Sequence, residues 1–365
     1  MKVLFFDITM NMTTKEKVLK ILAEAKGQSI SGETLAAECG VSRAAVWKAV
    51  TALREAGNSI EGTTNGGYVL ADDDIFSQEI FSETFSARWP DFSDCHIECF
   101  KEIDSTNTHA KRLLAETGNP RQYHKAILIA EKQTAGRGRI GRTFVSPEKS
   151  GIYFSIIYAP EGGITDPARL TASSAVAVCR ALKKVFADAD IEPQIKWIND
   201  IFLGGKKICG IGTEGITNFE SGIIEAAIIG IGVNIKRNSQ IEGTELGKIA
   251  GSIEEALSSD NSTPLPDFNR CQIAAEIIGQ VLKILEEDSK SPSAHAKIID
   301  EYKTSSFLLG KKVTVFPLIG DEKSSYKATA TDIDENAGLV VTIKDGSTKT
   351  LHSGEVSLKS GEFVT

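Results

Sequence analysis

The chain has 365 residues, of which 41% are hydrophobic and 25% charged, as is ordinary for a soluble protein of two or three domains. Its net charge of -8 at pH 7 excludes a global basic field, so contact with a nucleic acid would need a local patch. No apolar run approaches the ~20 residues that span a bilayer, and Asp7 interrupts the apolar start, so we expect neither a membrane segment nor a signal peptide. Six scattered cysteines and five histidines show no metal-site or disulfide spacing, which favours reduced thiols and a cytoplasmic location.

The first predicted unit, residues 13–71, has the pattern of a winged helix-turn-helix. Helices are expected at 13–26, 31–39 and 43–56, with Gly40 in the turn, and a hairpin is expected over 59–70. Asn65 and Gly66 supply the positive φ angles of its turn. Residues 72–95 form an acidic linker with a short helix at 75–85.

In this motif the helix after the turn enters the DNA major groove. Its exposed candidates are Ser42, Arg43 and Lys48, and the wing residues Thr63, Thr64 and Asn65 would lie on the DNA backbone. We assign Val46 and Trp47 to the core. Residues 13–71 carry seven Lys and Arg against six Asp and Glu, which fits modest DNA binding that needs dimerisation. The alternative is a winged helix used only for packing or for protein contacts.

The central region, residues 96–308, is predicted to be a sheet with covering helices. Ser105 and Thr106 are suited to cap a helix that runs to about residue 116, and the free N–H groups at such a terminus can bind an anion. Further strands are expected at 96–102, 125–131, 151–158, 206–214 and 223–234, and residues 194–203 are expected to form a strand, a polar kink at Asn199-Asp200 and a second strand. Further helices are expected at 166–186, 267–285 and 293–306.

A loop within this region, Glu131–Arg142, combines three glycines with three arginines. The glycines are Gly136, Gly138 and Gly141; the arginines are Arg137, Arg139 and Arg142. Glycine permits close backbone approach to a ligand, and arginine suits phosphate or carboxylate. The glycines also match G-x-G-x-x-G, but a polar turn and a strand follow instead of a helix, so we reject a dinucleotide fold. The loop is predicted to close on a polyanion, and the alternative is a solvated basic loop.

The last region, residues 309–365, changes to short alternating strands. They are expected at 312–316, 326–332, 338–343 and 348–353, with turns at Asp321, 336–338 and 345–346. This pattern predicts a small all-β barrel that covers the active site or binds a partner.

Almost the whole chain resembles the bifunctional biotin–protein ligases that also repress the biotin operon. The motifs that carry the resemblance are Ser105-Thr106-Asn107, the loop from Gly136 to Arg142, Lys196-Trp197-Ile198-Asn199-Asp200, Lys207-Ile-Cys-Gly-Ile211 and Gly354-Glu-Val-Ser-Leu358. The resemblance implies an α+β multidomain fold. Its parts would be the winged helix-turn-helix, a central α/β biotin-ligase sheet domain of the class II synthetase-like kind, and a C-terminal SH3-like β-barrel.

The same resemblance implies a two-step reaction and a regulatory role. Biotin and ATP would give biotinyl-5′-AMP, and a lysine of a biotin carboxyl carrier protein, from acetyl-CoA carboxylase or a similar enzyme, would then take the biotin. As a homodimer formed on adenylate binding, the protein would repress biotin genes at operator DNA. ATP chemistry implies Mg²⁺ held mainly by phosphates and water, so we predict no metal-ligating residue.

Residue roles follow from matching those motifs. Arg137, Arg139 and Lys207 would be catalytic, since two anions must meet and fixed positive charge is needed more than a base. Lys207 alone would otherwise be taken as a solvated partner of Lys206. The biotin-binding residues would be Ser105, Thr106, Asn107, Gln133, Arg137, Gly138, Arg139, Lys207, Gly210 and Gly212. The ATP- or adenylate-binding residues would be Gly136, Arg142, Asn199 and Asn234.

Three positions depart from the family pattern: Ile198 replaces a proline, Phe144 a tryptophan beside the adenine, and Gly212-Thr213 a larger apolar pair. They bear on the shape of the pocket more than on the type of reaction.

Two other functions stay open, a lipoate or octanoate ligase and a non-enzymatic biotin-sensing transcription factor. We further expect residues 136–142 to be a flap that orders over biotin and the adenylate.

Overall fold

The computed structural model describes residues 13–25, 27–55, 58–63, 66–72, 74, 76–218, 220–258, 269–317, 324–352 and 355–357. The chain divides into two compact units, Met1–Thr84 and Phe85–Thr365.

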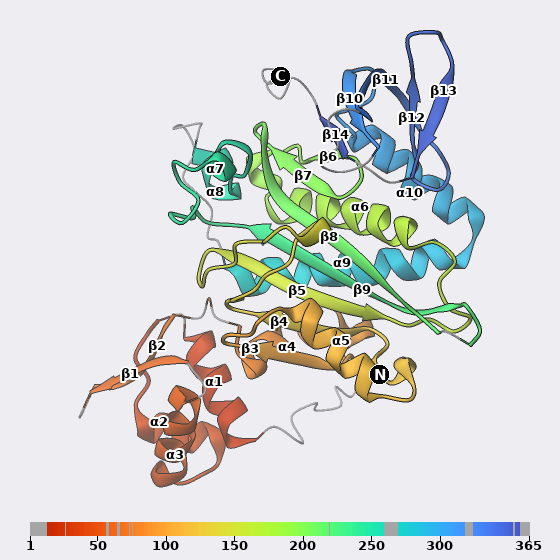
Figure 1. The fold of residues 1–365 in the computed structure, drawn as a ribbon. Coiled ribbons are helices and arrows are strands. Elements are labelled where there is room, and N and C mark those ends of the chain that lie inside the picture. Colours follow the sequence, from red (N-terminus) through yellow and green to blue (C-terminus); the bar gives the residue numbers. More distant parts are fainter. Residues whose placement is uncertain are drawn as a thin grey trace, which may run out of the picture. The chain divides into compact units, whose positions relative to one another are not determined.

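The first unit is a winged helix-turn-helix, as predicted. It contains helices α1 (Thr14–Glu24), α2 (Gly32–Cys39) and α3 (Arg43–Glu55) and the antiparallel strands β1 (Ser59–Thr63) and β2 (Gly67–Asp72) (Figure 1). Thr13 and Glu16 form a capping box at the start of α1. Gly40 ends α2 with a left-handed φ of 69°, which turns the chain toward α3.

The assignment of Trp47 to the core was wrong. The buried face of α3 consists of Val46, Ala49, Val50 and Leu53, whereas Trp47 is 59% exposed. These four residues complete the i, i+3, i+4, i+7 stripe of a helix, and Trp47 lies about 100° away from Val46 around the axis. The prediction favoured Trp47 for the core because its side chain is large and aromatic, but the inner position is filled by Ala49, a small residue.

Helix α4 (Gln78–Arg88) begins and ends three residues later than the predicted helix at 75–85. Ser77 Oγ accepts a hydrogen bond from the Ile80 N–H at 3.2 Å, so this serine caps the first turn and fixes where the helix begins.

The second unit is built on a seven-stranded sheet, in which β3 and β4 are parallel and all other neighbours antiparallel. In spatial order the strands are β3 (Ile97–Phe100), β4 (Ala126–Ala130), β5 (Gly151–Tyr158), β9 (Ile224–Asn234), β8 (Lys206–Thr217), β7 (Asp200–Leu203) and β6 (Gln194–Lys196). The predicted strand-kink-strand at 194–203 is confirmed as β6 and β7. Strands β4 and β5 are buried along their whole length, which explains their continuous apolar runs.

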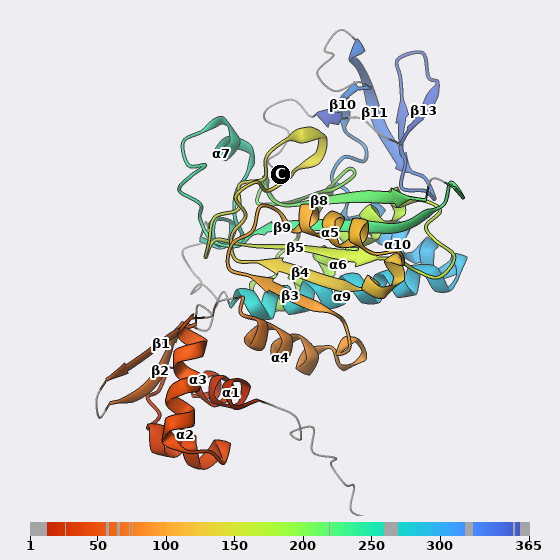
Figure 2. The ribbon, with the colours of Figure 1, turned by 60° about the horizontal axis from the view of Figure 1, so that its bottom comes forward.

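Helices cover both faces of this sheet. Helix α5 (Thr106–Glu116) packs on one face, where Ala110 and Leu114 meet Leu128, Ile157 and Ile228. Helices α6 (Pro167–Val185) and α9 (Arg270–Lys290) lie on the other face, followed by α10 (Pro292–Ser305) (Figure 2). Two short helices, α7 (Glu245–Ile249) and α8 (Ile253–Ser258), come after β9. No helix in the described part of the chain is long and apolar enough to cross a membrane.

The C-terminal strands form a five-stranded antiparallel sheet in the order β13-β12-β11-β10-β14. Their bounds are β10 (Lys312–Phe316), β11 (Tyr326–Ile333), β12 (Leu339–Thr342), β13 (Thr348–Leu351) and β14 (Glu355–Ser357). The four predicted strands are confirmed, and β14 adds a fifth. The turn before β12 docks on the central domain, because Trp197 Nε1 donates to Ala337 O at 2.8 Å and His295 Nε2 lies 2.5 Å from Glu335 O.

Glu276 of α9 is a fully buried carboxylate, and it generates a prediction about stability. It contacts Arg88 Nε at 2.5 Å, Lys184 Nζ at 2.9 Å and Gln280 Nε2 at 2.9 Å. Burial by itself would raise the pKa of Glu276, but these hydrogen bonds outweigh it and lower the pKa below 4.5. Its stabilisation is therefore present above about pH 4.5 and is lost as the pH falls through the lowered folded-state pKa.

We expect Glu276→Gln to lower the free energy of unfolding by about 1–3 kcal/mol at pH 7, since a buried charge pair loses one partner. The deficit should shrink at pH 3.5. Urea unfolding at both pH values measures it, with Glu287→Gln, a half-exposed carboxylate, as control. A deficit of equal size at both pH values would contradict the assigned ionisation.

Candidate functional site

One pocket gathers most of the residues singled out from the sequence. All ten predicted biotin-binding residues and Asn199 line it: Ser105, Thr106, Asn107, Gln133, Arg137, Gly138, Arg139, Lys207, Gly210 and Gly212. Its empty space, open mouth included, is about 520 Å³, within the range of small-molecule sites. Residues from four separate segments thus converge on a single cavity.

The floor of the pocket is made of paired glycines. In the register of β8 and β9, Gly210 lies opposite Gly232 and Gly212 opposite Gly230. A Cβ atom on Gly232 would come within 2.5 Å of the Phe144 ring, and one on Gly230 would overlap Asn107 Oδ1. Glycine is therefore required at these two positions so that Phe144 and Asn107 can lie directly on the sheet.

The glycine-arginine loop folds back on itself above this floor. Gly138 N donates to Arg142 O at 2.7 Å, and Phe144 N donates to Gly136 O at 2.9 Å. Gly141 has a φ of +70°, which favours glycine. A Cβ atom on Gly136 would collide with Phe144 O, so this glycine serves the close approach of two backbone segments.

A buried ion pair anchors the start of the loop. Arg270, the first residue of α9, is fully buried, and its Nη1 lies 2.8 Å from Glu131 Oε1. Arg270 Nη1 also donates to Gly151 O at 3.2 Å, and Glu131 Oε1 accepts the Lys149 N–H at 2.7 Å. Burial raises the pKa of neighbouring Tyr153 to about 12, so its phenol stays neutral. The loop therefore leaves the sheet from a rigid point.

Cationic side chains gather at the part of the pocket formed by β7 and β8. Arg139 Nη1 donates to Asn199 Oδ1 at 2.7 Å, and Asn199 Nδ2 donates to Ile211 O at 2.9 Å. Lys207 Nζ pairs with Asp200 Oδ1 at 2.7 Å. With Arg137, these groups provide three fixed positive charges, which suits a ligand that carries phosphate or carboxylate groups.

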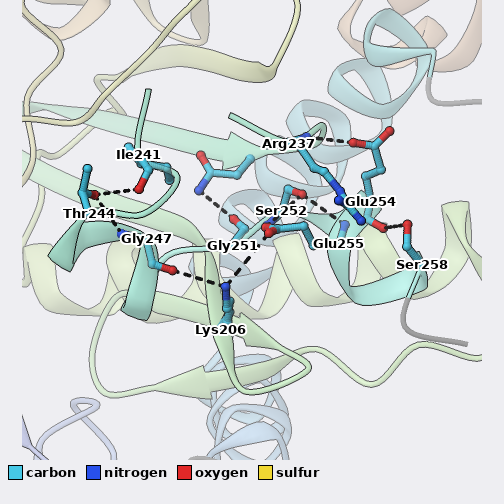
Figure 3. Close-up of polar contacts among 11 residues, drawn as sticks. Lys206, Arg237, Ile241, Thr244, Gly247, Gly251, Ser252, Glu254, Glu255 and Ser258 are labelled. Carbon is cyan, nitrogen blue, oxygen red and sulfur yellow. Dashed lines mark hydrogen bonds and ion pairs between the residues drawn. The ribbon is translucent and has the colours of Figure 1, made fainter. Parts of the chain in front are cut away.

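Lys206 and Lys207 do not act as a pair, because adjacent strand residues point to opposite faces. Figure 3 shows Lys206 directed at the segment after β9, where its Nζ donates to Gly247 O at 3.2 Å. In the same segment Ser252 N donates to Glu255 Oε2 at 2.8 Å. Lys207 instead lines the pocket. The reading of Lys207 as a solvated partner of Lys206 therefore fails.

The N-terminus of α5 forms the polar part of the pocket, and its cap differs from our prediction. Ser105 occupies the N-cap position but makes no side-chain capping bond. Gln133 Oε1 accepts the Thr106 N–H at 2.9 Å instead. Beside it, hydrogen bonds from Arg112 lower the pKa of Asp104 to about 2. The N–H group at the start of α5 is therefore hydrogen-bonded by Gln133, a residue of the glycine-arginine loop, and not by a side chain of the helix itself.

Three predicted adenylate residues lie outside the pocket lining. Gly136 and Arg142 belong to the backbone hairpin of the loop, and Asn234 Nδ2 donates to Gly251 O at 3.0 Å. Their contact with a nucleotide stays a prediction. Ile198 is buried, and the peptide bond between Trp197 and Ile198 is cis.

The predicted DNA-binding residues lie partly within the described chain. Ser42, Arg43 and Lys48 are exposed on or beside α3. Ser42 Oγ accepts the Ala45 N–H at 3.2 Å, so it also caps this helix. Thr63 ends β1, and Thr64 and Asn65 lie outside the described residues.

Sequence reasoning missed the second half of the pocket floor. Phe154, Gly230, Ile231 and Gly232 line the pocket, together with Ile211 and Phe144. A signal was present, because residues 230–232 repeat the Gly-Ile-Gly of residues 210–212. Because the two tripeptides lie on successive predicted strands, their glycines could have been predicted to lie opposite each other in the sheet.

Comparison with known proteins agrees with this geometry. The model of the "Biotin/lipoate A/B protein ligase family" matches residues 99–234, and that of an "HTH domain" matches residues 14–69. A Bacillus spizizenii protein named bifunctional ligase/repressor BirA is 33% identical over 247 residues, which cover 68% of this chain and 73% of that protein. The chain belongs to the bifunctional ligase/repressor BirA family.

The BirA relative from Escherichia coli is 27% identical over 351 residues, covering 94% of this chain and 98% of that protein. Among solved structures, the fold is similar to that of "Biotin protein ligase from Aquifex aeolicus in complex with biotin and ATP". That likeness has a TM-score of 0.57 at 24% identity and covers 72% of this chain and 97% of that one. Both units of this BirA-family chain thus have counterparts in the E. coli relative.

The glycine floor gives a prediction with an internal control. Gly232→Ala should lower the free energy of unfolding by about 1–3 kcal/mol, since the added methyl group must displace the Phe144 ring. Gly212→Ala adds the same group where nothing lies within 4 Å, so it should change stability little. Urea unfolding of both variants measures the difference, and equal losses would contradict the packing described here.

Proposed function

We propose that this protein activates biotin with ATP to biotinyl-5′-AMP and transfers the biotin to a lysine of a biotin carboxyl carrier protein. The observation that carries the proposal is the pocket itself, in which Arg137, Arg139 and Lys207 share one cavity with the polar N-terminus of α5. Its BirA relatives are named as ligases and repressors, which supports the same assignment.

The first step joins two anions, and the pocket chemistry suits it. The biotin carboxylate attacks the α-phosphorus of ATP, an acyl–phosphate bond forms, and the bond to pyrophosphate breaks. Carboxylate and phosphate repel each other, so fixed cations stabilise the approach and the charge that develops on the phosphate oxygens. Arg139, held by Asn199, and Lys207, held by Asp200, are positioned for this role. The attacking carboxylate is already deprotonated, so no general base is needed.

The described ranges contain no cluster of three His, Cys, Asp or Glu side chains suited to hold a metal. From the chemistry of ATP we propose that Mg²⁺ enters with the nucleotide, coordinated mainly by phosphate oxygens and water.

In the second step the carrier lysine attacks the acyl carbon of the mixed anhydride, and AMP leaves. The C-terminal antiparallel sheet, which we propose is an SH3-like barrel, lies next to Trp197 of the Lys196–Asp200 motif. This position suits a role in receiving the carrier or covering the site.

The first unit supports a second role as a repressor of biotin genes. Arg43 and Lys48 are exposed on α3, the helix that enters the major groove in this motif. We propose that biotinyl-AMP orders residues 136–142 as a flap over the site, and that the ordered form dimerises and binds operator DNA.

A single assay separates the proposal from its two alternatives. The protein is incubated with ATP, Mg²⁺, labelled biotin or lipoate, and an apo carrier domain. We expect label on the carrier from biotin only. Label from lipoate would favour a lipoate ligase, and no label from either acid would leave a biotin-sensing transcription factor.

Lys207→Ala should slow adenylate formation about 100- to 1000-fold, the range for removing one charge-stabilising donor. The side chain of Lys207 is partly exposed, so folding should be little affected. Pyrophosphate release in single turnovers measures the rate. The matched control is Lys206→Ala, which removes the neighbouring lysine that faces away from the pocket. An unchanged rate in Lys207→Ala would refute its proposed role.

Operator binding should depend on biotin plus ATP and weaken steeply between 50 and 200 mM salt, because phosphate contacts release counterions. Gel shifts on the promoter of the biotin genes measure it. Arg43→Ala should weaken binding at every salt concentration with catalysis unchanged, and a complex of equal strength without ligand would contradict adenylate control.

A further inference from the structure

The first unit exposes one large aromatic side chain to which the proposed function gives no role. Trp47 of α3 is the only tryptophan or phenylalanine among the large apolar side chains exposed in the described part of the chain. Its backbone carbonyl accepts a hydrogen bond from Thr51 Oγ1 at 2.9 Å, but no described residue hydrogen-bonds to the indole or stacks on it. One exposed ring proves nothing by itself, so its surroundings decide what it can bind.

Two cations flank the indole. Arg43 lies one helical turn before Trp47 and Lys48 directly after it, and both are exposed. Within the described ranges neither of them forms an ion pair, and the first turn of α3 contains no acidic residue. Arg54, at the other end of α3, instead donates Nε to Ile60 O at 2.7 Å and is held by the wing. This face therefore suits an anionic partner that presents apolar groups between its charges.

Small residues at the start of α3 leave the indole accessible. Side chains of a helix lean toward its N-terminus, and Ala44, one turn before Trp47, is exposed and too small to cover the ring. Ser42 Oγ is occupied in accepting the Ala45 N–H at 3.2 Å. The first turn therefore adds little bulk besides Arg43. A helix of this shape fits the DNA major groove, which is about 12 Å wide.

The position of Trp47 along α3 favours DNA over an acidic protein as the partner. In a helix-turn-helix the N-terminal residues of the second helix contact base edges in the major groove. Trp47 is the fifth residue of α3, whose opposite face, with Val46 and Val50, is buried in the core of the unit. The indole thus lies in the part of the helix that reaches the bases, while the flanking cations can reach phosphates.

The chemistry of the indole matches one base. Indole offers an apolar face and a single N–H donor, and it has no acceptor. In the major groove, thymine presents a C5-methyl group and the O4 acceptor, which suit both features. Cytosine lacks the methyl group and presents the N4 donor, which an indole cannot accept.

We propose that Trp47 selects thymine in operator DNA by packing its indole on the C5-methyl group in the major groove, with Arg43 and Lys48 holding the adjacent phosphates. The inference rests on the proposed repressor role. It names the residue that reads sequence and the base that it reads.

Deoxyuridine, which differs from thymidine only by the missing methyl group, tests this contact. The promoter fragment of the biotin genes is synthesised with either nucleoside, and gel shifts with full-length protein, biotin, ATP and Mg²⁺ give Kd. The wild type should bind the thymidine fragment at least about four-fold more tightly, the fold-change for one buried methyl group. Replacing the thymidines one at a time then locates the base.

Trp47→Ala should bind the two fragments equally, and no more tightly than the wild type binds the deoxyuridine fragment. Work at about 50 mM salt keeps the weakened complexes measurable. Trp47 is exposed, so the variant should fold, and unchanged biotin transfer to the carrier checks this. Trp47→Phe, which keeps an apolar ring, should retain part of the preference for thymidine.

Lys48→Ala is the matched control from the neighbouring position. It should weaken binding to both fragments by the same factor and lower the slope of log Kd against log salt by about one, because it removes a phosphate contact. The preference for thymidine should stay at the wild-type value. Trp47→Ala should leave the salt slope unchanged.

Two results would overturn the inference while leaving the repressor role intact. One is a wild type that binds both fragments equally, and the other is a Trp47→Ala variant that keeps the wild-type preference. Unaltered operator binding by Trp47→Ala would assign the indole to a protein contact instead. A wild type that forms no complex with either fragment would refute the repressor role itself, and the inference with it.

Discussion

The site depends on one constraint, the absence of side chains at four glycine positions of two paired strands. Gly-Ile-Gly occurs at residues 210–212 and 230–232, and the register of β8 and β9 places the glycines opposite each other. Glycine in a strand normally weakens it. Here the open floor allows Phe144 to lie across Gly232 and Asn107 to lie across Gly230. The sheet thus exchanges local stability for a cavity that lies directly on its backbone.

The two ends of this cavity are held by different physical means. The cationic end depends on ion pairs and charged hydrogen bonds, such as Lys207 with Asp200 and Arg139 with Asn199. The end at α5 depends on neutral hydroxyl and amide groups, such as Thr106, whose N–H donates to Gln133 Oε1, and Asn107, whose Nδ2 donates to Glu214 Oε1. The buried pair of Glu131 and Arg270 fixes the base of the glycine-arginine loop. Such a pair is strongly destabilising to break, which keeps the loop attached at one point.

Much of the fold could be predicted from periodicity and turn residues, because strands β4 and β5 are long apolar runs and Thr13, Ser31 and Asp166 cap their helices. The motifs also located Gly210 and Gly212, the two pocket glycines of β8. What could not be predicted depends on tertiary partners. Trp47 is exposed because Ala49 fills the inner position, and Gln133 caps α5 from a distant loop. The contacts of Glu214 with Asn107 and Lys111 had no motif to mark them, since they exist only once β8 faces α5.

The docking of the C-terminal sheet on Trp197 has a consequence for how the second unit folds. The buried indole N–H of Trp197 finds its acceptor, Ala337 O, only when the small sheet is in place, and His295 likewise contacts Glu335 O there. Without that sheet, a buried donor two residues from the pocket residue Asn199 would lack its partner. The second unit should therefore melt in one cooperative transition, and the small sheet should behave as part of the enzyme's core and not as a detachable module.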